Sequence, residues 1–245
     1  MLADGGDVGE SISKRRGWLT PMLWEALEEL GYDLIAIGKR DLADTSFQWL
    51  KSPRPKKAVY LTGNVSTKDG APITSPFQVI KRAGAKIGVV PVISKRYNGY
   101  FRNYRVGPVA ETIDKALAAF NNEKVDFRIL IFHGPRAEAR NLAKQYKDFD
   151  LFFLSSGEGR PMRTETDAAS GMLMVGPGDR GREMAFVTLE KKADRVEAKA
   201  SVIVLDTSVR KSSDEVAHIL KRFEEAARAR YARPKRPAPK PQQVP

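Results

Sequence analysis

Short apolar runs alternate with longer amphipathic stretches along most of this sequence. Runs that are apolar at nearly every position and end at a glycine or a charged residue are typical of buried strands. Such runs occupy residues 33–38, 58–65, 126–134 and 150–157. Stretches with apolar residues three or four positions apart predict helices, and these lie at residues 21–30, 46–50, 108–122, 136–147 and 213–231.

The spacing between these elements predicts how the strands are connected. A segment of helical length separates residues 126–134 from residues 150–157, so we expect these two strands to be parallel neighbours. The pair Ala83-Gly84 interrupts an alternating stretch and predicts a hairpin of two strands. Beyond Gly159, three short apolar runs separated by glycine-rich or charged turns predict a meander. The first helix is expected to pack through Leu23, Trp24, Leu27 and Leu30.

The composition is that of a globular protein with a basic carboxyl-terminal end. Of the 245 residues, 42% are hydrophobic, which is enough for a substantial core. About half of the net charge of +12 comes from residues 221–240, where eight Lys or Arg accompany two Glu. The absence of cysteine excludes disulfides, thiolate nucleophiles and Cys-ligated zinc. No apolar run approaches the roughly 20 residues of a membrane-spanning helix, and the first residues lack the pattern of a secretory signal.

The last residues differ from the rest of the chain. Five of the fourteen residues 232–245 are proline, and the segment offers no apolar set that could be buried. We therefore predict a folded domain over residues 1–231 and a disordered, basic, proline-rich tail over residues 232–245.

Polar clusters stand at four predicted strand ends. They are DGGD at residues 4–7, GKRD at residues 38–41, FHGP around His133, and SSGEGR at residues 155–160. Because α/β proteins usually keep their chemistry at the carboxyl ends of strands, these clusters are the candidate functional residues.

In order and spacing, these clusters resemble the catalytic domain of the metallophosphoesterase superfamily, in its 5′-nucleotidase (UshA-like) branch. GYDLIAIGKRDL matches a strand that ends in a GNHE motif, and VDFRILIFHGP matches a strand that ends in a histidine ligand. DFDLFFLSSGEGR is similar to the strand that ends in GHxH, while LTGNV and GPGDRGREMAFVTLE match the segments between and after them. The resemblance extends to about Asp206.

The resemblance implies an α/β (α+β) fold, a four-layer αββα sandwich of two mixed sheets flanked by helices. In that family the loops at the strand ends hold two divalent metals, which bridge a phosphoester and activate a water or hydroxide. Most 5′-nucleotidases of the family act outside the cytoplasm, so an extracytoplasmic or periplasmic location is the expectation for this chain. The family's Asp-x-His motif would lie upstream of Met1, which predicts a truncated amino terminus.

The matched positions depart from the family pattern. At the GNHE position, Lys39 replaces the metal-binding asparagine and Arg40 replaces the catalytic histidine. At the GHxH position, Glu158 and Arg160 stand where the family has its two histidine ligands. Asp7, in the position of the bridging aspartate, and His133 remain, so Asp7, His133 and Glu158 are the only candidate metal ligands. Arg40 and His133 occupy the positions of catalytic residues.

These departures predict a degenerate phosphoesterase domain. Two dications need several N or O donors and carboxylate charge around them, whereas Lys39, Arg40 and Arg160 would repel a divalent ion. The same three cations are suited to holding a phosphate directly, because Arg gives bidentate contacts and Lys gives a point charge. We therefore expect a domain without a resident cofactor that binds a phosphate-containing small molecule or a protein partner.

Two alternatives remain open on the sequence. In the first, the chain is an active phosphoesterase that binds Mn, Zn or Mg at an atypical site built on Asp7, His133 and Glu158. In the second, it is a nucleic-acid-binding module that uses the Arg- and Tyr-rich residues 96–105 and the basic tail. Nucleic-acid binding is the less favoured partner class, since no nucleic-acid motif accompanies these residues.

Overall fold

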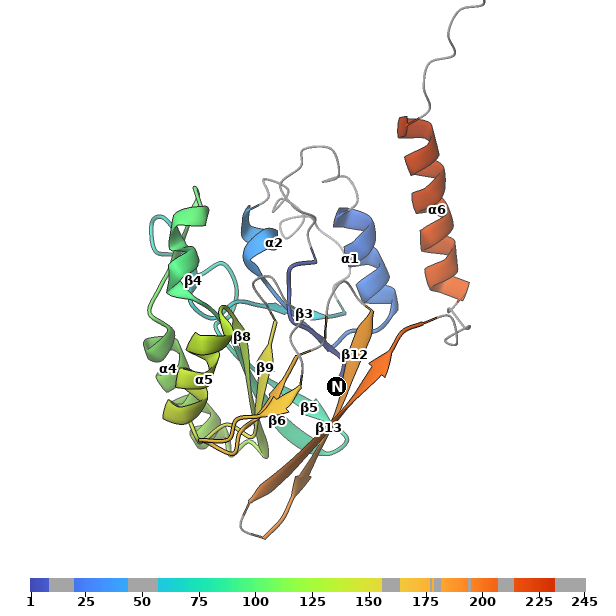
Figure 1. Cartoon of the computed structure of the whole chain (residues 1–245). Coiled ribbons are helices and arrows are strands. Elements are labelled where there is room, and N and C mark those ends of the chain that lie inside the picture. The colour runs from blue at the N-terminus through green and yellow to red at the C-terminus, as the bar shows by residue number, and fades with distance from the viewer. Residues whose placement is uncertain are drawn as a thin grey trace, which may run out of the picture. The chain divides into compact units, whose positions relative to one another are not determined.

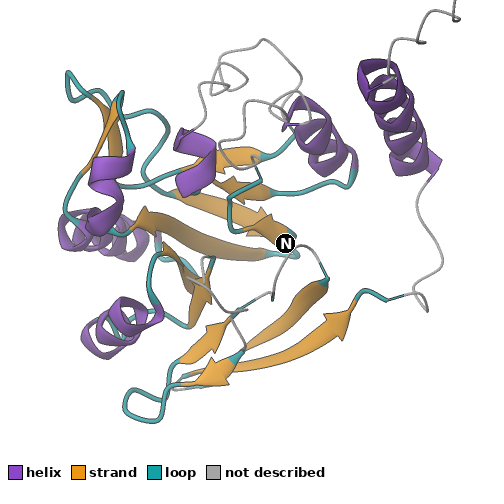
Figure 2. Cartoon of the chain, turned by 45° about the horizontal axis from the view of Figure 1, so that its top comes forward, coloured by secondary structure: helices purple, strands orange, loops and turns teal. Residues whose placement is uncertain are grey.

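The computed structural model consists of two layers of β-structure packed face to face, with helices on both outer sides (Figures 1 and 2). It describes residues 1–8, 20–43, 57–155, 164–176, 178, 182–193, 195–206 and 214–231. The chain divides into two compact units, Met1–Lys211 and Ser212–Pro245. The first unit contains all of the strands and all of the candidate site residues that the structure describes.

One layer is a mixed sheet of six strands. Its order is β10 (Glu165–Thr166), β11 (Leu173–Val175), β9 (Leu151–Leu154), β8 (Phe127–His133), β6 (Ala85–Ile93) and β5 (Gln78–Arg82). The four central strands are parallel, and the two edge strands β10 and β5 are antiparallel to their neighbours. The predicted parallel pairing of residues 126–134 with residues 150–157 is thereby confirmed.

The second layer contains a parallel sheet and a hairpin. The sheet has the order β1 (Ala3–Asp4), β2 (Leu34–Ala36) and β3 (Val59–Leu61), and the hairpin pairs β12 (Glu183–Lys191) with β13 (Val196–Val204). A further small hairpin joins β4 (Val65–Thr67) to β7 (Tyr104–Val106). The helices are α1 (Thr20–Glu29), α2 (Lys39–Ala43), α4 (Val109–Glu123), α5 (Arg136–Gln145) and α6 (Asp214–Tyr231), with a 3-10 helix η2 (Lys95–Tyr100).

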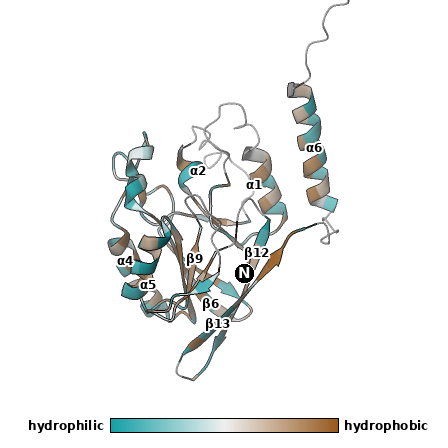
Figure 3. Ribbon diagram, in the orientation of Figure 1, coloured by the Kyte–Doolittle hydropathy of each residue, from teal (hydrophilic) through white to brown (hydrophobic). Residues whose placement is uncertain are grey.

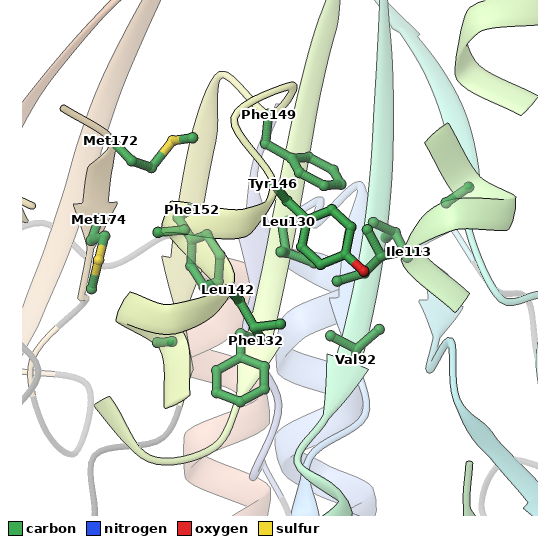
Figure 4. Packing of buried hydrophobic residues seen from close by; sticks show 14 of the residues in the cluster. Val92, Ile113, Leu130, Phe132, Leu142, Tyr146, Phe149, Phe152, Met172 and Met174 are labelled. Carbon is green, nitrogen blue, oxygen red and sulfur yellow. The ribbon is translucent and has the colours of Figure 1, made fainter. Parts of the chain in front are cut away.

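The alternation of side chains along each strand places them in different interfaces. On β8, Leu130 and Phe132 pack against α4 and α5, whereas Ile129 and Ile131 face the second layer. Figure 4 shows the first of these cores, where Phe132, Leu142 and Tyr146 meet. On β2, Leu34 and Ala36 face the large sheet, and Ile35 and Ile37 pack toward α1 and α2. The molecule therefore has three cores between four layers, and the predicted four-layer fold is confirmed.

Two local predictions from the sequence are confirmed. The predicted hairpin forms between β5 and β6, and its turn uses Ala83 and Gly84, both at positive φ (48° and 80°). This is the backbone conformation of a tight turn that matches the twist of the strands it joins. The predicted helix over residues 21–30 is α1, and Trp24 is fully buried.

Three other predictions need correction or lie outside the described residues. The meander is wrong for its first strand, because β11 pairs parallel to β9 in the large sheet and only β12 and β13 form a hairpin. Leu23 and Leu30 are exposed, because the core contact of α1 is made through Trp24 and Leu27. The helix predicted at residues 46–50 and the tail at residues 232–245 lie outside the described residues.

The last helix, α6, belongs to the second unit, whereas the sequence predicted a boundary after residue 231. Val216, Ile219 and Phe223 recur along this helix at the spacing of one helical face. Among the described residues, no helix is long and apolar enough to cross a membrane.

The side chain of Asn64 joins three backbone segments of the first unit. Its buried side-chain amide donates to the carbonyls of Ile93 and Gly107 and accepts from the Ile93 N–H, at 2.8, 3.1 and 2.8 Å. These bonds hold the end of β6 and the loop after β7 against the segment between β3 and β4.

Replacing Asn64 by Ala would leave these buried backbone groups without a partner, and each such group costs about 1–3 kcal/mol. We expect Asn64→Ala to lower the free energy of unfolding by about 2–4 kcal/mol, measured by urea denaturation. Asn103→Ala, at an exposed position, is the control and is expected to change it by less than about 0.5 kcal/mol. Equal effects of the two substitutions would contradict this role for Asn64.

Candidate functional site

The candidate site forms where the loops after β1, β2, β8 and β9 meet. Asp7 follows β1, Lys39 and Arg40 begin α2 directly after β2, and His133 is the last residue of β8. The structure brings these four sequence-predicted residues together, because β2 and β8 end at the same edge of the two packed layers. Glu158 and Arg160 lie outside the described residues.

Close approach of two backbone segments creates the site. Gly6 has a φ of +92°, and a Cβ at this position would lie 2.5 Å from the Gly38 nitrogen and 2.8 Å from the Ala36 carbonyl oxygen. A Cβ on Gly38 would collide with the carboxylate of Asp7. Both positions therefore require glycine, which lets the loop after β1 lie directly against the end of β2.

The carboxylate of Asp7 caps the helix that begins at Lys39. Asp7 Oδ1 accepts the backbone N–H of Arg40 at 2.7 Å, a bond that the side chain of a helix N-cap residue usually supplies. Gly38 stands in the cap position and has no side chain, so Asp7 substitutes for it from another strand. Asp7 itself has a φ of 63°, in the left-handed region that Asp tolerates better than most residues.

Asp41, in the first turn of α2, also joins the loop after β1 to the start of this helix. Its Oδ2 accepts the N–H of Gly38 and the N–H of Asp7, both at 2.8 Å, and the side chain is almost fully buried. An acidic side chain three residues after the cap, bonded back to the cap N–H, is half of a capping box. That spacing was visible in the sequence, but we did not predict a role for Asp41.

The imidazole of His133 is fixed by a hydrogen bond at each nitrogen. Nε2 lies 3.2 Å from the backbone N–H of Lys39 and accepts from it, and Nδ1 lies 2.8 Å from Ser155 Oγ. Since a backbone amide can only donate, Nε2 carries no proton and Nδ1 donates to Ser155. The Ser155 hydroxyl lies 3.5 Å from the carbonyl of Phe132 and donates to it. Ser155 lies in the strand-end cluster predicted at residues 155–160, but the sequence assigned it no role of its own.

The charge around His133 favours the neutral ring. Burial lowers the pKa of His133 below its usual value, and the positive charges of Lys39 and Arg40 lower it further. Asp7, whose Oδ2 is 3.5 Å from Nε2, opposes part of this change. The neutral ring is the form that the two hydrogen bonds require.

The side chains of Lys39 and Arg40 have different surroundings. The Arg40 side chain is 56% exposed, and its Nε lies 3.9 Å from Asp7 Oδ2. The ammonium of Lys39 lies over the rings of Tyr97 and Tyr100, 4.4 and 5.3 Å from their centroids. Tyr97 is fully buried on η2 and its ring also lies against His133, whereas Tyr100 is 61% exposed. Within residues 96–105, the rings of Tyr97 and Phe101 are buried in the core that contains Trp24.

The described residues do not fit a pair of divalent metals. The lone pair of His133 Nε2, which a metal would need, accepts the Lys39 N–H instead. The Asp7 carboxylate is engaged by the Arg40 N–H and faces the Arg40 guanidinium. Within the described ranges, no group of three His, Cys, Asp or Glu side chains is arranged to hold a metal ion.

Known proteins share the fold of this chain but little of its sequence. No protein-family model and no curated protein matched it. Among solved structures, the calcineurin-like phosphoesterase YfkN from Bacillus subtilis superposes with a TM-score of 0.74 over 95% of this chain and 85% of its own, at 14% identity. The sulfate thiohydrolase SoxB and a 5′-nucleotidase precursor, both from Thermus thermophilus, give TM-scores of 0.77 and 0.72, each at 14% identity.

The coverage of the last two structures is unequal. This chain is covered over 95% and 94% of its length, but it spans only 43% of the SoxB chain and 50% of the 5′-nucleotidase chain. The resemblance drawn from the strand-end clusters is thereby confirmed at the level of the fold.

The capping role of Asp7 predicts a metal-independent contribution to stability. Asp7→Gly relieves the positive φ but removes the acceptor, and we expect it to lower the free energy of unfolding by about 1–2 kcal/mol in the presence of EDTA. Asp7→Asn keeps an oxygen acceptor and is expected to cost less than half as much. Urea denaturation checks both values, and an Asp7→Gly variant as stable as the parent in EDTA would contradict the capping role.

Asp4 predicts a pH dependence of stability. Burial raises its pKa to about 6, and Asp7 nearby adds to the increase, while the N–H of Gly6 that Asp4 Oδ1 accepts at 2.8 Å opposes it. Because the folded-state value lies above the unfolded value of 3.8, the folded chain binds more protons between these pH values, and Asp4 lowers stability as pH rises through that window.

Asp4→Asn removes this ionisation and keeps an acceptor for Gly6. We expect it to raise stability above pH 7 by about 1–3 kcal/mol and to have little effect near pH 4, as judged by melting temperature against pH. A gain of the same size at both pH values would show that the ionisation of Asp4 is not the cause.

Proposed function

From the metallophosphoesterase fold that this chain adopts, we propose that it is a degenerate phosphoesterase domain that binds a phosphate-containing anion at the strand-end site without two-metal hydrolysis. The observation that carries this proposal is the engagement of both remaining ligand positions by the chain itself. The N–H of Arg40 bonds to Asp7, and the N–H of Lys39 bonds to His133. Both backbone groups belong to the residues that replace the metal-binding motif.

The charges of the site support an anionic ligand. Asp41 is almost fully buried and accepts two backbone N–H groups, so its negative charge is offset inside the fold. The guanidinium of Arg40 is instead at the rim, more than half exposed, and offers N–H groups to solvent. Arg suits a phosphate through bidentate contacts, and the ammonium of Lys39 can add a point charge from its place on the tyrosine rings.

Several finer assignments remain part of this proposal. The ligand is a phosphate-containing small molecule, and a phosphate-bearing protein segment would present the same chemistry. Arg160 is proposed as a third cation of the site. The resemblance to a 5′-nucleotidase described as a precursor supports an extracytoplasmic location for this domain as well.

Measurements of thermal stability and turnover with and without metal distinguish this proposal from an active phosphoesterase. A metal that binds the folded state raises its melting temperature. Because we propose that no metal binds, we expect neither EDTA nor added Mn²⁺ to change the melting temperature of the whole chain. We also expect no turnover of p-nitrophenyl phosphate with Mn²⁺ present. Stoichiometric Mn²⁺ together with turnover that His133→Ala abolishes would establish the active alternative instead.

Anion binding is tested by calorimetric titration of the chain with inorganic phosphate and with adenosine monophosphate. We expect Lys39→Ala/Arg40→Ala to weaken binding by about tenfold or more, since two charge-assisted contacts are lost. Lys68→Ala/Lys81→Ala removes two exposed cations elsewhere and serves as the charge-matched control. Equal weakening by both double variants would indicate attraction to net charge alone and would overturn a specific site.

A further inference from the structure

Two Lys-Arg pairs stand beside each other at the edge of the fold that holds the anion site. The first is Lys39-Arg40, at the beginning of α2, and the second is Lys95-Arg96, at the beginning of η2. Only Ser94 separates the second pair from the end of β6. The strands themselves are apolar, as Figure 3 shows for β9, so the charge at this edge comes from the residues that follow the strands. The anion site proposed above uses the first pair and not the second.

His133 is bonded to the chain at both pairs. Its Nε2 accepts the N–H of Lys39 at 3.2 Å, and its backbone carbonyl accepts the N–H of Ser94 at 2.9 Å. The second bond follows from the register of the large sheet, in which Ile93 of β6 is paired with His133 of β8. Lys39 and the residue that precedes Lys95 are therefore held by one and the same residue.

A side-chain contact joins the two pairs a second time. The ammonium of Lys39 lies over the rings of Tyr97 and Tyr100, and both rings belong to η2. The centroids of these two rings are 5.9 Å apart, and Tyr97 is fully buried. Lys39 thus lies against the short helix that carries Lys95 and Arg96, so the positive charge of the first pair is adjacent to the second.

The second pair faces solvent. Lys95 and Arg96 are both exposed, and Lys95 takes part in no ion pair with the described residues. The carboxylate that reaches the base of this pair is that of Glu138, which accepts the hydroxyl of the fully buried Ser94 at 2.6 Å. No Asp or Glu occurs in residues 70–110. The second pair therefore offers the same combination of one lysine and one arginine that the first pair offers.

We propose that Lys95 and Arg96 form a second phosphate subsite beside the first, so that the ligand of this site is a compound with two phosphate groups, a diphosphate or a bisphosphate. The inference rests on the function proposed above, in which Lys39 and Arg40 hold the first phosphate. The second phosphate receives a point charge from Lys95 and a bidentate contact from Arg96. Two linked phosphates bind more tightly than one, because the second group binds from a ligand that is already attached.

Calorimetric titration of the whole chain with orthophosphate, pyrophosphate and fructose 1,6-bisphosphate tests this ligand class. We expect at least one of the two double phosphates to bind about tenfold or more tightly than orthophosphate. The tighter of the two then shows whether the phosphate groups are adjacent or separated. Equal affinity for all three compounds would overturn the second subsite.

A double variant assigns the preference to the second pair. Lys95→Ala/Arg96→Ala is expected to reduce the preference for the double phosphate to less than about threefold, because the contacts of the second phosphate are lost. Both side chains are exposed, so the variant should fold, and its melting temperature checks this. Lys68→Ala/Lys81→Ala removes two exposed cations on other elements and is expected to keep the preference. A preference that survives in the first variant, or that both variants reduce equally, would contradict the assignment.

Failure of the anion site itself gives a different result. In that case the parent chain would not bind orthophosphate, or Lys39→Ala/Arg40→Ala would leave orthophosphate binding unchanged, and both proposals would be overturned. Orthophosphate binding that depends on Lys39 and Arg40, without a preference for either double phosphate, would overturn the second subsite alone.

Discussion

The carboxylate of Asp7 is the group through which the end of β1 is joined to the beginning of α2. One oxygen caps the helix at Arg40, the other faces the guanidinium of Arg40 and the ring of His133, and the N–H of Asp7 is held by Asp41. Gly6 and Gly38 are needed because these contacts require the two backbone segments to approach within the space of a side chain. The arrangement depends on two acidic side chains, Asp7 and Asp41, whose hydrogen bonds connect the loop after β1 to the start of α2.

In the function proposed above, the side chains of Lys39 and Arg40 supply the positive charge that bound metal ions would otherwise provide. A divalent metal held between carboxylates and imidazoles stabilises a site only when the metal is bound, and its contribution changes with metal concentration. Lys39 and Arg40 are part of the chain, so their charge and their backbone N–H groups are present whenever the domain is folded. In the proposed function no metal-activated water takes part, and the more than half-exposed guanidinium of Arg40 leaves positive charge at the strand-end site.

Most elements of the fold could be predicted from the sequence, because strands buried on both faces and helices with one apolar stripe leave strong periodic patterns. The strands containing Ile131 and Phe152, their parallel pairing and the Ala83-Gly84 turn were all visible in this way. The meander prediction failed because a short apolar run such as β11 carries no signal for the sheet it joins. Pairing between distant strands is decided by which edge is free and which core needs covering.

For the site, the sequence by itself determined which residue types stand at the strand ends: the cations Lys39 and Arg40, the carboxylate of Asp7 and the imidazole of His133. Only the tertiary structure decided what these groups bond to. Asp7 and Arg40 are 33 positions apart, and Lys39 and His133 are 94 positions apart, so no local pattern could reveal that backbone N–H groups occupy both candidate ligands. The first contact follows from the pairing of β1 with β2 and the second from the packing of two sheets, and both bring strand ends together regardless of their distance along the chain.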